Sequence, residues 1–147
     1  MATELQHKKI IALQGISSSG KTITIKKLNS LLLENGYSKM FDCYNEKNEL
    51  VGILQKGEVL VGISSLQYDI AQELFEILIK RECRIIICAH LSRELTIELI
   101  QPFKGYVDYQ YDYVLKTFTS SPTLQERVNQ ADAIQLFGKV QAALTSN

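Results

Sequence analysis

The chain has 147 residues, with 16 basic and 16 acidic side chains, so its formal net charge at neutral pH is zero. This length predicts a single domain over residues 1–147, because domains usually contain about 100–200 residues. The balanced charge argues against nucleic acid as a partner, since a protein that holds a duplex through its overall field needs an excess of Lys and Arg, although it leaves a local basic site open. No apolar run approaches the roughly 18 residues that span a bilayer, so we expect no membrane partner.

The N-terminal segment and the cysteines indicate a cytoplasmic protein. Residues 1–9 lack the apolar stretch and the small-residue cleavage site of a signal peptide. Cys43, Cys83 and Cys88 are an odd number of cysteines, at spacings that match neither a zinc ribbon nor a disulfide framework. Cys83 and Cys88 lie in or beside an apolar run, where a reduced thiol acts as a small hydrophobe.

Strand and helix signals alternate from the beginning of the chain. Residues 9–14 form a short apolar run that leads into Gly15 and suits a buried strand. Residues 22–34 carry apolar side chains at helical spacing, and Asn35-Gly36 marks the end of this helix. A second strand is expected over 39–44, followed by a hairpin with strands over 50–54 and 59–63 and its turn at Lys56-Gly57.

The same alternation continues through the second half. The spacing predicts a helix over about 67–81, with an apolar stripe of Ile70, Leu74, Ile77 and Leu78, and then a central parallel strand over 84–89. A short helix over 92–100 and a strand over 106–118 follow. The last helix begins at Ser121-Pro122 and extends toward residue 144. This order predicts an α/β domain, a three-layer αβα sandwich with a mostly parallel sheet and an added antiparallel hairpin.

Residues 15–22, GISSSGKT, match G-x-x-x-x-G-K-[ST], the phosphate-binding loop, and lie between an expected strand and an expected helix. The two glycines supply the backbone angles and clearance needed to wrap a polyphosphate, and the N–H groups at a helix start favour negative charge. Lys21 adds a cation for the β- and γ-phosphates, and the Thr22 hydroxyl can ligate Mg²⁺. The expected nucleotide-binding residues are Gly15, Ser17, Ser18, Ser19, Gly20, Lys21 and Thr22.

On this motif the chain resembles the P-loop NTPase superfamily, in layout over most of its length and in motif over residues 10–34. Its compact strand–loop–helix–strand opening is most similar to small nucleoside, nucleotide and adenylylsulfate kinases. Residues 62–89 are also similar to uncharacterised small ATP-binding proteins of bacteria and phages. The resemblance implies the P-loop NTPase fold, with ATP or another nucleoside triphosphate and Mg²⁺ as cofactors. It also implies Mg²⁺-dependent, kinase-like phosphoryl transfer to a small-molecule acceptor.

The acidic residue that such chemistry needs is less plainly marked. The two later apolar strands end in Ser64-Ser65 and at His90, so neither ends in a Walker B acid. The resemblance gives Asp42 the role of the base that takes the acceptor's proton or holds Mg²⁺ through water, although a solvated aspartate at a strand end explains it equally. Asp69 is the alternative metal ligand, and the dipole of the helix it begins is already a sufficient reason for a carboxylate there. Glu46 is a weaker candidate.

Cations around the migrating phosphoryl group are the other requirement of phosphoryl transfer. Arg93 follows the carboxyl end of a strand, where ligands bind in open α/β sheets, and small kinases place a lid arginine near there. The whole lid would be residues 90–94, much shorter than an adenylate-kinase lid. His90 is either a polar group at the pocket mouth or simply a histidine at a strand end.

A second function stays open beside the kinase-like one. The missing Walker B acid and arginine-rich lid favour a nucleotide-dependent switch, or slow NTPase, that acts through a protein partner. The compact chain and Asp42 favour the kinase-like use, which we prefer on the sequence. The absence of N-K-x-D and D-x-x-G motifs argues against a regulatory GTPase. Tyr109, Tyr111 and Tyr113 alternate along a late strand, a pattern more typical of a core or an interface than of a base-stacking platform. If that strand is an edge, the tyrosines could form a homodimer contact.

Overall fold

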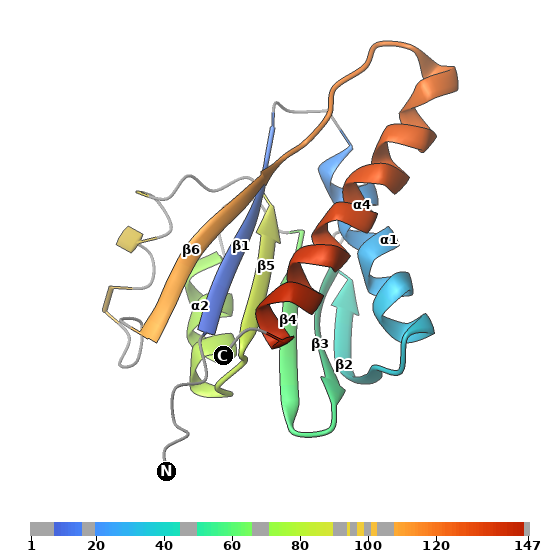
Figure 1. Cartoon of the computed structure of the whole chain (residues 1–147). Helices are drawn as coiled ribbons and strands as arrows, with labels where there is room; N and C mark the ends of the chain where they lie inside the picture. Colours follow the sequence, from blue (N-terminus) through green and yellow to red (C-terminus); the bar gives the residue numbers. More distant parts are fainter. Residues whose placement is uncertain are drawn as a thin grey trace.

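The computed structural model describes residues 8–15, 20–44, 50–65, 71–89, 94, 97–98, 101–102 and 108–145. Within these residues the chain is an α/β structure with a six-stranded mixed sheet and three helices (Figure 1). The strands are β1 (Lys8–Gln14), β2 (Ser38–Tyr44), β3 (Leu50–Lys56), β4 (Val59–Ser64), β5 (Ile85–Ala89) and β6 (Tyr109–Leu115). The helices are α1 (Lys21–Glu34), α2 (Ala71–Lys80) and α4 (Pro122–Thr145).

The sheet has the strand order β2-β3-β4-β5-β1-β6. β1 runs parallel to both of its neighbours, β5 and β6, and β4 runs parallel to β5. β3 is antiparallel to β2 on one side and to β4 on the other. Five of the six strands therefore end at the same edge of the sheet, which confirms a mostly parallel sheet with an antiparallel hairpin between β3 and β4.

Helices cover both faces of the sheet, with α1 and α4 on one face and α2 on the other (Figure 1). The side chains of β1 alternate between two cores: Ile11 and Leu13 pack under α1 and α4, whereas Ile10 and Ala12 pack under α2. β5 is buried at every position, as expected of a central parallel strand. β1 is paired on both sides, with β5 and with β6, so the loop that follows it begins from a strand held within the sheet.

Local sequence signals determine where α1 ends and where α4 begins. α1 ends at Glu34, and Gly36 has φ 94°, a left-handed conformation that glycine adopts without a side-chain clash. The N–H of Tyr37 then donates to the carbonyl of Leu32 at 3.1 Å, which closes the last turn. α4 begins at Pro122, as predicted, and the carbonyl of Ser121 accepts its first hydrogen bonds.

Two predictions of local structure are wrong. The hairpin turn consists of Gly57 and Glu58, with Lys56 paired to Val59, so the strands extend closer to the turn than expected and the turn lies one residue later. In α2 the buried apolar side chains are Phe75, Leu78 and Ile79, whereas Ile77 is 41% exposed. The helix places Ile77 about 100° around its axis from Leu78, which turns it away from the sheet. The Leu74 side chain and all of Ile70 lie outside the described residues.

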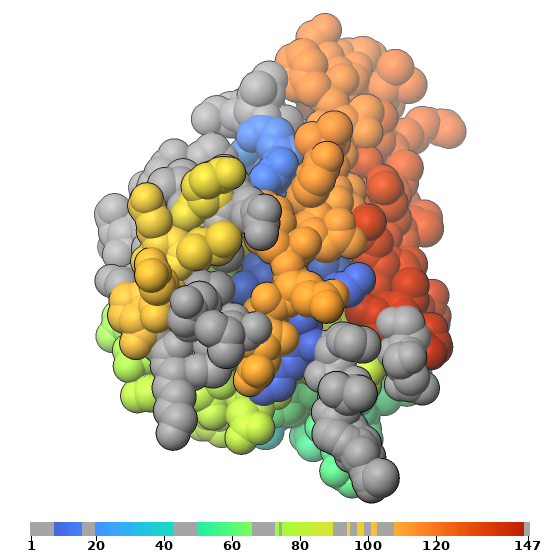
Figure 2. Space-filling model, turned by 60° about the vertical axis from the view of Figure 1, so that its left-hand side comes forward, coloured from blue at the N-terminus to red at the C-terminus, as the bar shows by residue number. Residues whose placement is uncertain are grey.

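β6 forms one end of the strand order, next to β1. Figure 2 shows β6 and the segment that follows it, in orange, at the surface of this face. Tyr109 and Tyr111 pack against the core under α2, as predicted, and Tyr113 is 50% exposed. The helix expected over 92–100 falls largely outside the described residues.

Candidate functional site

The phosphate-loop motif spans the connection between β1 and α1. β1 ends at Gln14, Gly15 follows it, and α1 begins at Lys21. Gly20 is the residue before the helix and has φ 97° and ψ 19°, a left-handed conformation that favours glycine. Residues 16–19, which include Ser17, Ser18 and Ser19, lie outside the described residues. The structure therefore places the two ends of the expected loop at the edge where the parallel strands end.

Lys21 brings its charge back to the start of the loop. Its side chain is buried, and Nζ donates a hydrogen bond of 2.5 Å to the carbonyl oxygen of Gly15. Burial lowers the pKa of Lys21 below its usual value of 10.5, because an ammonium loses hydration in the protein interior. A buried cation thus lies against both ends of the loop.

The first turn of α1 provides donors and a hydroxyl group. The backbone N–H and the Oγ1 hydroxyl of Thr24 both donate to the carbonyl of Gly20, at 2.9 and 2.8 Å. The N–H groups before Thr24 have no acceptor within the helix and point out of its beginning. Thr22 lies half-buried in this turn, and its hydroxyl oxygen is the hard ligand that Mg²⁺ prefers.

The structure does not bring Asp42 to the loop. Asp42 is on β2, and its carboxylate forms an ion pair of 2.8 Å with Lys39. Three strands lie between β2 and β1, which at a strand spacing of about 4.8 Å separates these two strands by about 19 Å. Asp69, Arg93, Glu46 and His90 lie outside the described residues. Of the predicted site residues, those brought together are Gly15, Gly20, Lys21 and Thr22.

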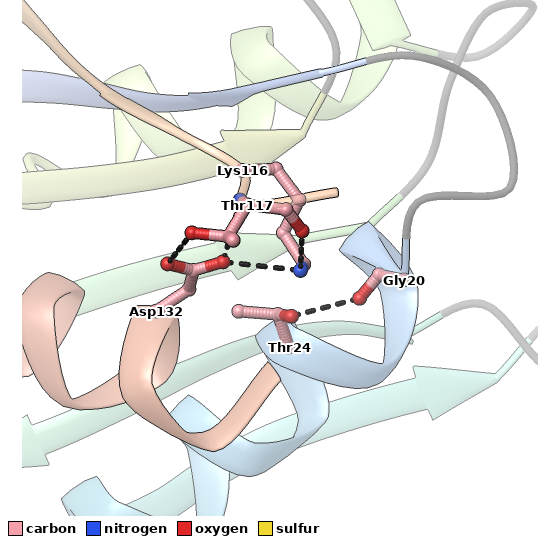
Figure 3. A network of polar contacts seen from close by, with 5 residues as sticks. All are labelled: Gly20, Thr24, Lys116, Thr117 and Asp132. Carbon is pink, nitrogen blue, oxygen red and sulfur yellow. Dashed lines mark hydrogen bonds and ion pairs between the residues drawn. The ribbon is translucent and has the colours of Figure 1, made fainter. Parts of the chain in front are cut away.

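Sequence reasoning missed a buried polar network beside the loop (Figure 3). The side chains of Lys116 and Asp132 are 0% and 5% exposed and form an ion pair of 3.0 Å. Asp132 also accepts hydrogen bonds from the backbone N–H of Thr117 at 2.8 Å and from its hydroxyl at 3.0 Å. The backbone N–H of Lys116 donates to the carbonyl of Gln14 at 2.6 Å. This network joins α4 to the end of β6 and, through Gln14, to the residue before the loop.

A second polar side chain of α4 contacts the loop directly. Asn129 is 5% exposed, and a Cβ atom added to Gly20 would lie 2.4 Å from its Oδ1 atom. A signal for these residues exists in the sequence. Asn129 and Asp132 occupy the same helical stripe as the buried apolar residues of α4, namely Ala133, Leu136, Val140 and Ala143. Polar residues on a buried stripe indicate a specific partner.

Among the described residues, neither the metal-ligating side-chain types nor the cavity forms a second candidate site. Within the described ranges, no group of three or more His, Cys, Asp or Glu side chains is placed to hold a metal ion. A cavity of about 310 Å³ lies between the C-terminal ends of α1 and α4, lined by residues that include Tyr37, Lys56 and Phe137. It contains none of the predicted site residues.

Compared with models of known families, with curated proteins and with solved structures, the chain matches none. In the part of the chain that the structure describes, no helix is both long enough and apolar enough to cross a bilayer.

Proposed function

We propose that the protein binds a nucleoside triphosphate, with ATP the expected nucleotide, through residues 15–22. The observation that carries this proposal is the position of Lys21, whose Nζ lies 2.5 Å from the carbonyl of Gly15 at the other end of the loop. A polyphosphate bound by the N–H groups at the start of α1 would take this ammonium from the carbonyl. The left-handed Gly20 allows the backbone to approach such a ligand closely.

Mg²⁺ belongs to this proposal. When bound, the ion would neutralise phosphate charge, and the Thr22 hydroxyl is the protein group in the described residues that we assign to it. The chain's own contribution is to hold the phosphates with Lys21 and backbone N–H groups. The cytoplasmic location also remains a proposal and rests on the reduced cysteines expected from the sequence.

The use made of the nucleotide has two candidates, and the position of Asp42 distinguishes them. Kinase-like transfer to a small-molecule acceptor needs a base within about 3 Å of the attacking hydroxyl. Asp42 is paired with Lys39 on the strand farthest from β6, which does not support that role. This separation favours the second candidate, a nucleotide-dependent switch or slow NTPase that acts through a protein partner.

Thermal stabilisation by MgATP tests the binding site. We expect ATP at 100 times its Kd to stabilise the protein by about 2.7 kcal/mol, which corresponds to about 5–10 °C in Tm for a chain of this size. Lys21→Ala should abolish this shift and leave the Tm without ligand nearly unchanged. Lys27→Ala, on the same helix, is the control and should retain the shift. An equal shift in wild type and Lys21→Ala would contradict the proposal.

Turnover assays separate the two uses. A kinase consumes ATP only when its acceptor is present, and Asp42→Asn should then remove turnover while leaving ATP binding intact. A switch or slow NTPase hydrolyses ATP slowly at a rate that does not depend on small-molecule acceptors or on Asp42. Acceptor-dependent turnover that is lost in Asp42→Asn would overturn our preference for the second use.

A further inference from the structure

Asn129 has a buried polar atom that the structure leaves unsatisfied. The residue is 5% exposed, and its Oδ1 atom is buried and has no hydrogen-bond partner among the described residues. Buried polar groups in folded proteins nearly always find a partner, because losing hydration without a replacement hydrogen bond costs free energy. An acceptor retained under these conditions indicates a partner in another state of the protein.

The unsatisfied atom faces the last residue of the phosphate loop. The gap between Asn129 and Gly20 is so narrow that an added Cβ would meet Oδ1 at 2.4 Å and both Cγ and Nδ2 at 3.0 Å. Gly20 is also the residue that precedes α1, with φ 97°. Since Oδ1 is shielded from solvent, the donor that reaches it most directly is the loop's own backbone.

Asn129 cannot move away freely, because the next turn of α4 is fixed. Asp132, three residues later, holds the backbone N–H and the hydroxyl of Thr117 and the ammonium of Lys116 (Figure 3). The backbone N–H of Lys116 is in turn bonded to the carbonyl of Gln14, in the strand that leads into the loop. The amide of Asn129 is therefore held at a set position relative to the end of β1.

We infer that Asn129 is a positioning residue of the phosphate loop, whose Oδ1 accepts a hydrogen bond from the backbone N–H of Gly20 when the loop binds a triphosphate. The inference rests on the proposed nucleotide binding. Glycine allows the peptide group before it to rotate without a side-chain clash, so this N–H can turn toward α4. Phosphate binding then satisfies an acceptor that is unsatisfied without ligand, and part of the affinity comes from that change.

Binding measurements on Asn129→Leu and Asn129→Ala test this role, with MgATP and with magnesium tripolyphosphate as probes. Leu has nearly the shape of Asn but no acceptor, so the Tm without ligand should be unchanged or higher. The Kd for both probes should rise about fivefold, the effect of losing one hydrogen bond. A purely structural Asn129 predicts the reverse, a lower Tm and an unchanged Kd. Asn129→Ala gives the same Kd comparison without the risk of a clash.

The matched control is Asn29→Leu, which removes another buried asparagine, 8% exposed, two turns into α1. Its Kd for both probes should equal that of wild type. An unchanged Kd in both Asn129 variants would overturn the inference, as would a loss confined to ATP, which would mean a contact with base or sugar. If wild type binds neither probe, the proposed nucleotide binding itself is overturned. The wild-type Kd is therefore measured before that of any variant.

Discussion

Lys21 shows how a single residue carries two opposing requirements. In the site that we propose, its ammonium must be charged to bind phosphate, yet burial at the start of α1 lowers its pKa from 10.5. The unfolded chain binds this proton more tightly than the folded chain does. The Lys21 contribution to the free energy of unfolding therefore rises with pH between the lowered pKa and 10.5.

Nucleotide binding should have the opposite pH dependence. As pH rises above neutral toward 10.5, Lys21 loses its proton earlier than an ordinary lysine, and the affinity for MgATP should fall. The shift in Tm caused by MgATP, measured across this range, should shrink in wild type. Lys21→Arg provides the reference, because a guanidinium keeps its charge over this range, so its pH profile contains only the titration of the other lysines and the tyrosines. Parallel profiles for the two proteins would show that Lys21 does not carry the binding charge.

At the scale of elements, α4 is the helix that joins the end of β6 to the loop region. Its two buried polar side chains lie one turn apart: Asn129 contacts Gly20, and Asp132 binds Thr117. Because β6 is the edge strand beside β1, this attachment also holds the edge of the sheet in place. These polar contacts of α4 therefore stabilise the fold as well as the candidate site.

Asp132→Ala should destabilise the protein strongly. Its removal leaves the ammonium of Lys116 buried without its carboxylate, and breaking a buried ion pair in this way costs about 3–5 kcal/mol. Urea denaturation should show this loss as a lower midpoint. Glu126→Ala, on the same helix, breaks an exposed contact of 3.5 Å with Lys27 and should leave the midpoint nearly unchanged. Similar midpoints for the two variants would contradict the claim that the buried ion pair contributes more to stability than the exposed one.

At the scale of the whole molecule, two of the three cysteines lie in the core under α2, and their reactivity measures whether that core opens. Cys83 and Cys88 are both buried free thiols, and burial raises the pKa of each to about 12. The reactive thiolate is therefore scarce at neutral pH as well as shielded.

Alkylation at pH 8 followed by peptide mapping should leave Cys83 and Cys88 unlabelled in the folded protein. Both should react once urea unfolds the chain, and their labelling should follow the global transition. Mapping by peptide keeps Cys43 separate from this measurement. Rapid labelling of Cys88 in the native protein would mean that the sheet beneath α2 opens locally.

The sequence predicted the features that depend on neighbouring residues. The ends of α1 and α4 are marked by Gly36 and Pro122, and the apolar run of β5 identifies a strand buried on both faces. Features that depend on residues far apart in the chain could not be predicted from the sequence in the same way. The pairing of Lys116 with Asp132 joins a strand end to a helix interior, and only the packing of α4 against β6 brings them together. The exposure of Ile77 likewise depends on which side of α2 faces the sheet.

The pairing of the strands also sets the order in which the molecule can be completed as it emerges from the ribosome. β2, β3 and β4 follow one another along the chain and pair as neighbours, so each finds its partner soon after synthesis. β1 is made before all of them, yet Lys9 pairs with Ile85 and Lys8 with Tyr109. A nascent chain that stops short of β6 already contains the whole GISSSGKT segment but lacks one of the two strands that support it. The phosphate binding that we propose is thus expected only late in translation, although the residues that would carry it are among the first to be made.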